Sequence, residues 1–197
     1  MARPSIRENL VQAGLHMLWQ HGYAGAPVRD ITDLAGARPG SFTNHFPSKE
    51  QFAEEVLDRY FAYVGTLVAA ALADDGPSPA GRLRRYFDLI TDKLAAESWA
   101  RGCMIGNFSL EVSPHSEALR RRLSQIFEEW RRPFAACIAE GQAAGEITDA
   151  CSADDLADFL LSSWQGAMLR MKVDRDPAPL DRFKKIIGAT LFAKASP

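Results

Sequence analysis

Apolar residues recur along this chain at intervals of three and four, and no stretch alternates convincingly with a period of two. This spacing predicts helices almost everywhere, and therefore an all-α fold. Residues 74–79, DDGPSP, combine two prolines, a glycine and two aspartates, so they are expected to be a linker between helices. Beyond this linker, helices are expected at about 79–98, 103–112, 114–144, 152–173 and 178–194.

Four more helices are expected before the linker, at about 5–21, 28–35, 39–46 and from 48 onwards. Gly36 stops the second helix, because glycine tolerates the positive φ that a tight turn requires. The third is expected to begin with Pro39 at its first position and to bury Phe42 and Phe46, four residues apart. Ser48 is expected to cap the fourth helix.

Two short helices joined by a tight turn are typical of a helix-turn-helix, whose second helix normally enters the DNA major groove. Arg38 and Asn44 are candidates for contacts with base edges, and Thr43, His45 and Lys49 for contacts with phosphates. The candidate DNA-binding residues are Arg29, Arg38, Ser41, Thr43, Asn44, His45 and Lys49. The alternative is a compact three-helix packing unit with exposed polar residues, and the nearly balanced local charge does not decide between the two.

The amino-acid composition limits the class of protein to which this chain can belong. The chain has 197 residues, of which 47% are hydrophobic and 24% charged, with a formal net charge of −2, as is usual for a globular protein. The apolar run at residues 67–73 is too short to span a bilayer, and no signal peptide is apparent, so we expect a cytoplasmic protein.

The three cysteines, Cys103, Cys137 and Cys151, lack the paired spacing of a zinc site and fit a reducing compartment. Cys137 is expected in the core and Cys151 at the surface. Glu111 and His115 lie on either side of a Ser-Pro step without a third ligand, so we interpret them as solvent-exposed or pocket polar groups. The sequence therefore predicts no metal and no cofactor.

The run GYAGAPVRDITDLAGARPGSFTNHFPSKEQF resembles the N-terminal pattern of the TetR/AcrR family of bacterial transcriptional regulators. This resemblance implies a nine-helix homodimer with a DNA-binding domain at 1–50 and a ligand-binding and dimerisation domain at 51–197. The chain departs from the family in having Ala26-Pro27 where a Ser or Thr usually caps the second helix. It also has Thr43 in place of a common tyrosine and Pro39 in place of a frequent lysine, which implies modest DNA affinity.

The C-terminal half, with RGCMIGNFSLEVSPHSEALRRRL and WQGAMLRMKV, resembles a narrower Gly-Cys branch that includes electrophile-responsive repressors of the N-ethylmaleimide and acrylate type. Cys103 falls at a predicted helix start, where backbone N–H groups favour a thiolate. Lys172 matches a lysine of that branch and would lower the thiol pKa further if it lay nearby. The alternative is that Cys103 is a small buried apolar residue.

Large apolar side chains in the C-terminal half are candidates for a ligand pocket or for the core. They are Phe108, Trp130, Phe134, Trp164 and Met168, which join Cys103 and Lys172 as candidate effector residues.

The last two long helices are expected to form the dimer surface. One contributes the small residues Ser162, Ser163, Gly166 and Ala167, and the other the apolar residues Leu180, Phe183, Ile187 and Leu191. Alternatively, these stripes complete the core of the monomer. A twofold dimer predicts a palindromic operator.

The sequence thus predicts a ligand-responsive DNA-binding regulator, most simply a repressor, and not an enzyme. Its effector is either a noncovalent apolar ligand or an electrophile that modifies Cys103. A thiol enzyme using Cys103 with His115 as base is a rival hypothesis, but it lacks an orienting third group. A helical interaction module without DNA binding is another.

Overall fold

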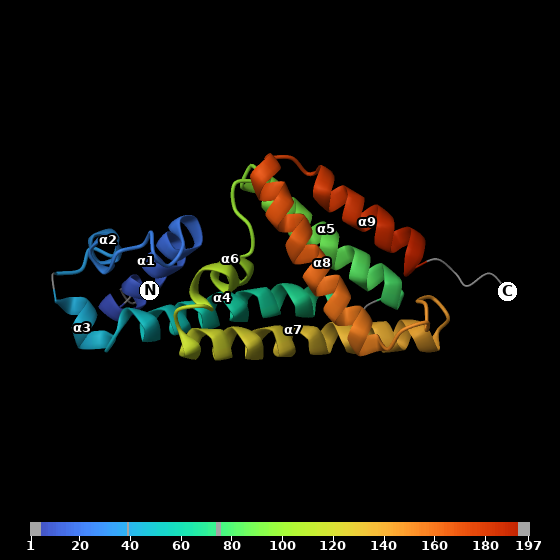
Figure 1. The fold of residues 1–197 in the computed structure, drawn as a ribbon, viewed down its shortest axis with the longest axis horizontal. Coiled ribbons are helices and arrows are strands. Elements are labelled where there is room, and N and C mark those ends of the chain that lie inside the picture. Colours follow the sequence, from blue (N-terminus) through green and yellow to red (C-terminus); the bar gives the residue numbers. More distant parts are fainter. Residues whose placement is uncertain (1–4, 39, 74–75, 193–197) are drawn as a thin grey trace. The chain divides into compact units, whose positions relative to one another are not determined.

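The structure is a computed structural model, and it describes residues 5–38, 40–73 and 76–192. All regular secondary structure in these ranges is helical, which confirms the predicted fold class (Figure 1). The helices are α1 (Ile6–His21), α2 (Val28–Leu34), α3 (Ser41–His45), α4 (Lys49–Leu72), α5 (Pro79–Ala96), α6 (Met104–Val112), α7 (Glu117–Ala143), α8 (Ala153–Asp174) and α9 (Ala178–Thr190).

Serine side chains begin several of these helices, as expected of residues that accept a backbone N–H at a helix start. Ser5 Oγ accepts from Glu8 N at 3.2 Å, and Ser48 Oγ accepts from Gln51 N at 3.1 Å. The predicted start of α7 at 114 is wrong, because Ser116 caps this helix, with its Oγ 3.1 Å from Leu119 N.

The start of α3 also differs from the prediction. The helix begins at Ser41, after Gly40 with a φ of 86° in the left-handed region, and Pro39 lies outside the described residues. The first helical turn therefore depends on glycine conformation rather than on a proline at the first position.

The chain divides into two compact units, with one boundary inside α4, one at the start of α6 and one inside α7. Unit 1 comprises the chain up to Tyr63 with Met104–Gln125, and unit 2 comprises Val64–Cys103 with the chain from Ile126 onwards. This division coincides neither with residue 50 nor with the linker at 74–79, so the functional limits 1–50 and 51–197 stay a prediction.

In unit 2, two arginines of α5 close the C-terminal end of α4. Arg85 donates to the carbonyls of Ala71 (2.7 Å) and Ala73 (2.9 Å), and Arg82 donates to that of Leu72 at 3.2 Å. These carbonyls have no partner within the helix, so the guanidinium groups satisfy them. Arg82 is itself buried and ion-paired with Glu140.

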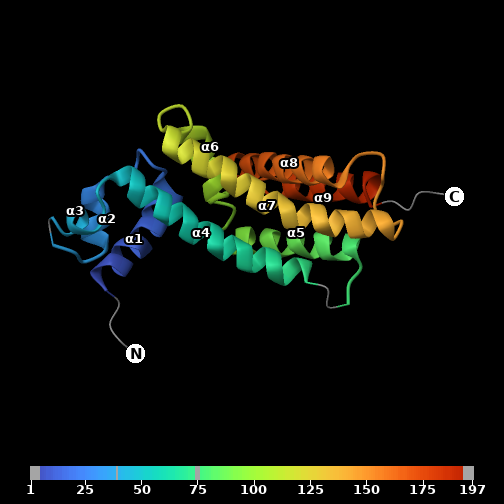
Figure 2. The ribbon, with the colours of Figure 1, turned by 90° about the horizontal axis from the view of Figure 1, so that it is seen from below.

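Helices α8 and α9 pack against each other within unit 2, and α9 also contacts α5 (Figure 2). Three residues of the apolar stripe predicted to form a dimer surface, Leu180, Phe183 and Ile187, are instead buried in this unit. The alternative reading, in which they complete the monomer core, is therefore correct for them. A different set of apolar side chains remains exposed on these helices: Phe159, Leu169, Val173 and Ile186.

Candidate DNA-binding surface and effector region

The turn between α2 and α3 depends on two glycines. Gly36 has a φ of 62° and Gly40 a φ of 86°, and a Cβ at either position would meet nothing within 4 Å. Glycine is therefore required by backbone conformation and not by lack of space. The N–H of Ala37 donates to the carbonyl of Thr32 at 3.0 Å, which closes the end of α2.

An aromatic cluster holds α3 in place. The ring of Phe52 on α4 lies 5.0 Å from that of Phe42 and 4.8 Å from that of Phe46, in edge-to-face geometry. All three rings are buried, as expected for Phe42 and Phe46 from their spacing. The Arg7 guanidinium covers the Phe46 ring at 5.2 Å. This cluster packs α3 against α4 and leaves the opposite, outer face of α3 exposed.

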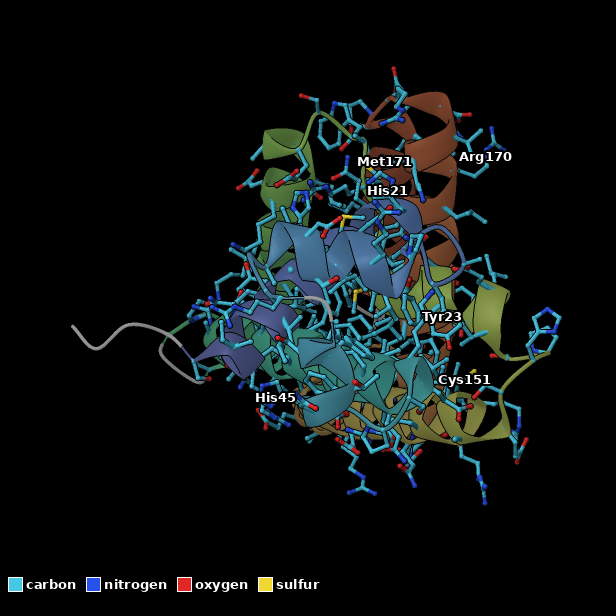
Figure 3. The ribbon with its side chains drawn as sticks, turned by 90° about the vertical axis from the view of Figure 1, so that its left-hand side faces the viewer. His21, Tyr23, His45, Cys151, Arg170 and Met171 are labelled. Carbon is cyan, nitrogen blue, oxygen red and sulfur yellow. The ribbon has the colours of Figure 1, made fainter. Side chains whose placement is uncertain are left out.

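Most of the candidate DNA-binding side chains lie on that outer face or next to it. Arg29, Arg38, Thr43, Asn44 and His45 are exposed, and Ser41 is partly buried. Figure 3 labels His45 at the end of α3, apart from Tyr23. Thr43 Oγ donates to the Gly40 carbonyl at 2.9 Å, and Arg29 faces Asp33 at 3.8 Å in an exposed pair. Their roles toward DNA remain predictions.

Lys49 differs from the other candidates, because its ammonium is already engaged. Lys49 Nζ donates to the carbonyl of Tyr23 at 2.5 Å and lies 4.4 Å from the centre of the Tyr23 ring. Burial lowers the pKa of Lys49, while the nearby Glu111 carboxylate opposes this shift. The ammonium that was expected to reach a phosphate thus holds the turn between α1 and α2.

Glu111 was expected to be a solvent-exposed or pocket group, and the structure shows a different role. Its carboxylate accepts two backbone N–H groups, from Tyr23 at 2.8 Å and from Ala24 at 2.6 Å. His115 is exposed, and no cluster of metal-ligating side chains occurs among the described residues. The only sequence signal for this contact was Gly22, which has a φ of 75° beside the turn.

The candidate effector residues fall into different units. Phe108 is in unit 1, where its ring lies 6.2 Å from that of Tyr23. Trp130, Phe134, Trp164 and Met168 are buried in unit 2.

Phe87 links two of these buried rings. Its centroid is 6.4 Å from that of Phe134 and 5.0 Å from that of Trp164. Sequence reasoning did not single out Phe87. The Trp164 indole N–H is buried and has no hydrogen-bond partner in the described part of the chain.

Cys103 immediately precedes α6 and is buried. Tyr86 on α5 interacts electrostatically with Cys103, and burial together with this neighbour raises the pKa of the Tyr86 hydroxyl, which stays protonated. Sequence reasoning missed Tyr86, because nothing in its spacing separates it from other core aromatics. Lys172 is partly buried in the last turn of α8, and its predicted role in effector sensing stays a prediction.

The other two cysteines lie where the sequence placed them. Cys137 is buried, donates its S–H to the Pro79 carbonyl at 3.4 Å, and burial raises the pKa of its thiol to about 11. Cys151, labelled in Figure 3, is exposed.

A surface groove of about 310 Å³ lies between α5 and α9 in unit 2. It is lined by Arg84, Phe87, Asp88, Lys184, Lys185 and Ile187. None of the predicted effector residues lines it. Two of its charges already pair with each other, since Lys184 Nζ lies 3.1 Å from Asp88.

Comparison with known proteins supports the helix-turn-helix interpretation of unit 1. The family described as "Bacterial regulatory proteins, tetR family" matches residues 10–56, and "Tetracyclin repressor-like, C-terminal domain" matches residues 79–187. The chain belongs to the tetR family. It is therefore a DNA-binding transcriptional regulator, and the nine helices of its described residues form the architecture of that family, whose members are generally not enzymes.

The similarity to known proteins covers nearly the whole chain. The HTH-type transcriptional repressor DhaR from Mycobacterium sp. (strain GP1) is 44% identical over 98% of this chain and 95% of its own length. The crystal structure of a TetR regulatory protein from Rhodobacter sphaeroides is 31% identical, with a TM-score of 0.89 over 94% of this chain and 98% of that one.

A second similar structure is a cysteine mutant of the TetR family regulator CifR in complex with a 26-base-pair operator DNA. It is 26% identical to this chain, with a TM-score of 0.78 over 96% of this chain and 97% of that one. In the part of this chain that the structure describes, no helix is long and apolar enough to cross a membrane.

Proposed function

We propose that this regulator is a cytoplasmic, homodimeric repressor that leaves a palindromic operator when a small-molecule effector binds its C-terminal domain. The observation that carries the proposal is the polar outer face of α3, held on the Phe42–Phe46–Phe52 cluster. The repressor named among its relatives and the operator complex of a similar structure support it.

Within this proposal, Arg38 and Asn44 contact base edges, because both side chains are exposed and their guanidinium and amide groups can make directional hydrogen bonds to bases. Arg29, Ser41, Thr43 and His45 contact the sugar-phosphate backbone and set the register. Substituting a base-reading residue should relax sequence preference, while substituting a phosphate-binding residue should weaken binding to all sequences about equally.

Fluorescence anisotropy on a labelled duplex of the DNA upstream of the gene tests this assignment. Arg38→Ala and Asn44→Ala should each reduce the preference for that duplex over a scrambled one by about five- to 150-fold, the equivalent of 1–3 kcal/mol per base-reading contact. Arg121→Ala, which removes an exposed arginine on α7, is the matched control. Salt-independent binding, or equal affinity for both duplexes, would count against a specific regulator and in favour of an interaction module.

The dimer is proposed to form through the exposed stripe of α8 together with Ile186 of α9. Phe159, Ser162, Gly166, Leu169 and Val173 follow one another at intervals of three and four and are all exposed, so they share one face of α8. Apolar residues at both ends and small residues in the middle allow two copies of the helix to approach closely. Ser162 and Gly166 were predicted at this interface from sequence, whereas the buried Ala167 cannot contribute its side chain.

The effector is proposed to act on unit 2, where two observations support binding of a small molecule. The buried Trp164 N–H has no acceptor among the described residues, and a buried donor without a partner costs about 1–3 kcal/mol. Cys103 interacts electrostatically with the buried Tyr86. A noncovalent ligand with a hydrogen-bond acceptor would use Trp164, and an electrophile would modify Cys103.

An alkylation experiment distinguishes the covalent effector from the noncovalent one. N-ethylmaleimide adducts should be mapped by mass spectrometry in a Cys151→Ser background, because Cys151 is exposed. Cys137 should react slowly, since burial raises the pKa of its thiol. An adduct on Cys103 that releases DNA supports the covalent effector. A Cys103 adduct that leaves DNA binding unchanged supports the noncovalent one, and turnover of an added thioester would instead revive the thiol-enzyme alternative.

A further inference from the structure

The turn between α1 and α2 is held by a carboxylate from α6, far away in sequence. Glu111 accepts the backbone N–H of Tyr23 at Oε2 (2.8 Å) and that of Ala24 at Oε1 (2.6 Å). Both hydrogen bonds involve a charged acceptor, so each is stronger than a bond between neutral groups. All three residues belong to unit 1.

The residue that precedes the turn confirms how closely the carboxylate approaches. Gly22 has a φ of 75°, and a Cβ built on it would stand 2.6 Å from Glu111 Oε2. Any other residue here would be strained in its backbone and would also displace the carboxylate. Both the conformation and the space at this position thus fit a turn closed by Glu111.

Lys49 holds the same turn through the backbone carbonyl of Tyr23. While Glu111 takes the Tyr23 N–H, Lys49 Nζ donates to the Tyr23 carbonyl and lies 4.4 Å from the ring centre. The Tyr23 ring also packs edge-to-face with Phe108 of α6, with centroids 6.2 Å apart. The N–H, the carbonyl and the ring of one residue are therefore all held by α4 and α6.

The turn leads directly into α2, and this helix has no cap of its own. Its N-cap position is Pro27, which makes no side-chain hydrogen bond there. Without a Ser or Thr to fix its first turn, the position of α2 depends on what holds the preceding segment. Helix α2 in turn contacts α3, which carries the proposed DNA-binding face.

We propose that Glu111 is a positioning residue for DNA binding, and that Lys49 serves with it to hold the Tyr23 turn instead of binding a phosphate. This inference rests on the proposed function. It differs from the expectation drawn from sequence, in which Lys49 reaches the DNA backbone and Glu111 lies in solvent or in a pocket.

The test compares Glu111→Ala, Glu111→Gln and Lys49→Met with the wild type by anisotropy on the upstream duplex over a range of salt concentrations. Glu117→Ala is the matched control, because Glu117 is an exposed carboxylate that pairs only with arginines on its own helix in the described part of unit 1. Amide hydrogen exchange at Tyr23 and Ala24 is measured in the same variants without DNA.

Glu111→Ala should raise the operator Kd by about tenfold or more and accelerate exchange at both amides, because each loses a charged acceptor. Glu111→Gln should lie between the alanine variant and the wild type, since an amide offers one carbonyl acceptor for two donors. Lys49→Met should leave the slope of log K against log salt unchanged, whereas loss of a phosphate contact would reduce it by about 0.9. Glu117→Ala should match the wild type in every measurement.

Operator binding by Glu111→Ala equal to that of the wild type would overturn the positioning role, and a reduced salt slope in Lys49→Met would overturn the assignment of Lys49. If Glu111→Ala fails to fold, Glu111→Gln carries the same comparison. Wild-type protein that ignores the duplex at every salt concentration would refute the proposed function and this inference together. That outcome is distinct from wild-type binding with unaffected variants, which refutes the inference alone.

Discussion

Replacing Gly166 by alanine should stabilise the folded subunit but weaken the dimer. Gly166 lies within α8, where glycine costs a helix about 1 kcal/mol relative to alanine. It is exposed, and a Cβ built on it meets no atom within 4 Å. Nothing inside the subunit therefore requires glycine, and the free energy of unfolding of the isolated subunit should rise by about 1 kcal/mol.

The dimer should respond in the other direction. If Gly166 lies at the closest approach of the two α8 helices, a methyl group on each copy forces them apart. Overpacking of this kind costs about 1–3 kcal/mol, which corresponds to a dissociation constant raised by about five- to 150-fold. A larger side chain, as in Gly166→Leu, should abolish the dimer while leaving the helix intact.

Two measurements separate the effects. Sedimentation equilibrium gives the dimer dissociation constant, and urea unfolding at a concentration below that constant gives the stability of the subunit. Gly65→Ala is the matched control, because Gly65 also lies inside a long helix, α4, with nothing within 4 Å of a built Cβ. It should gain the same stability without weakening the dimer.

The reasoning would be refuted by a Gly166→Ala protein that dimerises as tightly as the Gly65→Ala control. The exposed stripe from Phe159 to Val173 would then not be the interface between subunits. Loss of subunit stability in Gly166→Ala would equally contradict it, because the open space around this position leaves no source for such a loss.

Three further predictions concern packing and titration. Gly14→Ala should destabilise the protein by about 1–3 kcal/mol in urea unfolding, because its Cβ would stand 2.3 Å from Cζ of Phe52; unchanged stability would mean that the ring moves freely. Phe52→Ala should lower the free energy of unfolding by about 3–5 kcal/mol and weaken operator binding. A folded variant that binds the operator duplex as tightly as the wild type in the anisotropy assay would show that the aromatic cluster does not position α3. The buried Cys137 thiol binds its proton more tightly in the folded state than in the unfolded state. The free energy of unfolding should therefore fall as the pH rises from about 9 toward about 11. A Cys137→Ala protein whose stability declines equally over this range would contradict that assignment.

Local structure followed from the sequence where the deciding residues are neighbours in the chain. Ser5, Ser48 and Ser152 accept backbone N–H groups at the helix starts expected for them, and Phe42 and Phe46 are buried as their spacing indicates. The start of α7 was misplaced because residues 113 and 116 are both serines, and only the packed structure selects Ser116 as the cap.

Contacts between distant segments could not be predicted in the same way. Glu111 and Tyr23 are separated by 88 residues, and no periodicity marks a carboxylate that accepts backbone N–H groups. The face of α9 that packs inside the unit was equally ambiguous, because adjacent isoleucines point in different directions. Ile187 is buried and Ile186 is exposed, although both are apolar.

Arg82 and Arg85 hold the last carbonyls of α4 from α5, so the end of α4 does not depend on the segment that follows it. Gly76 and Pro77 of that segment are exposed. New chain termini made by circular permutation between these two residues would therefore leave both helix ends in place. A reporter peptide inserted at this point would likewise leave the last carbonyls of α4 held by the two arginines.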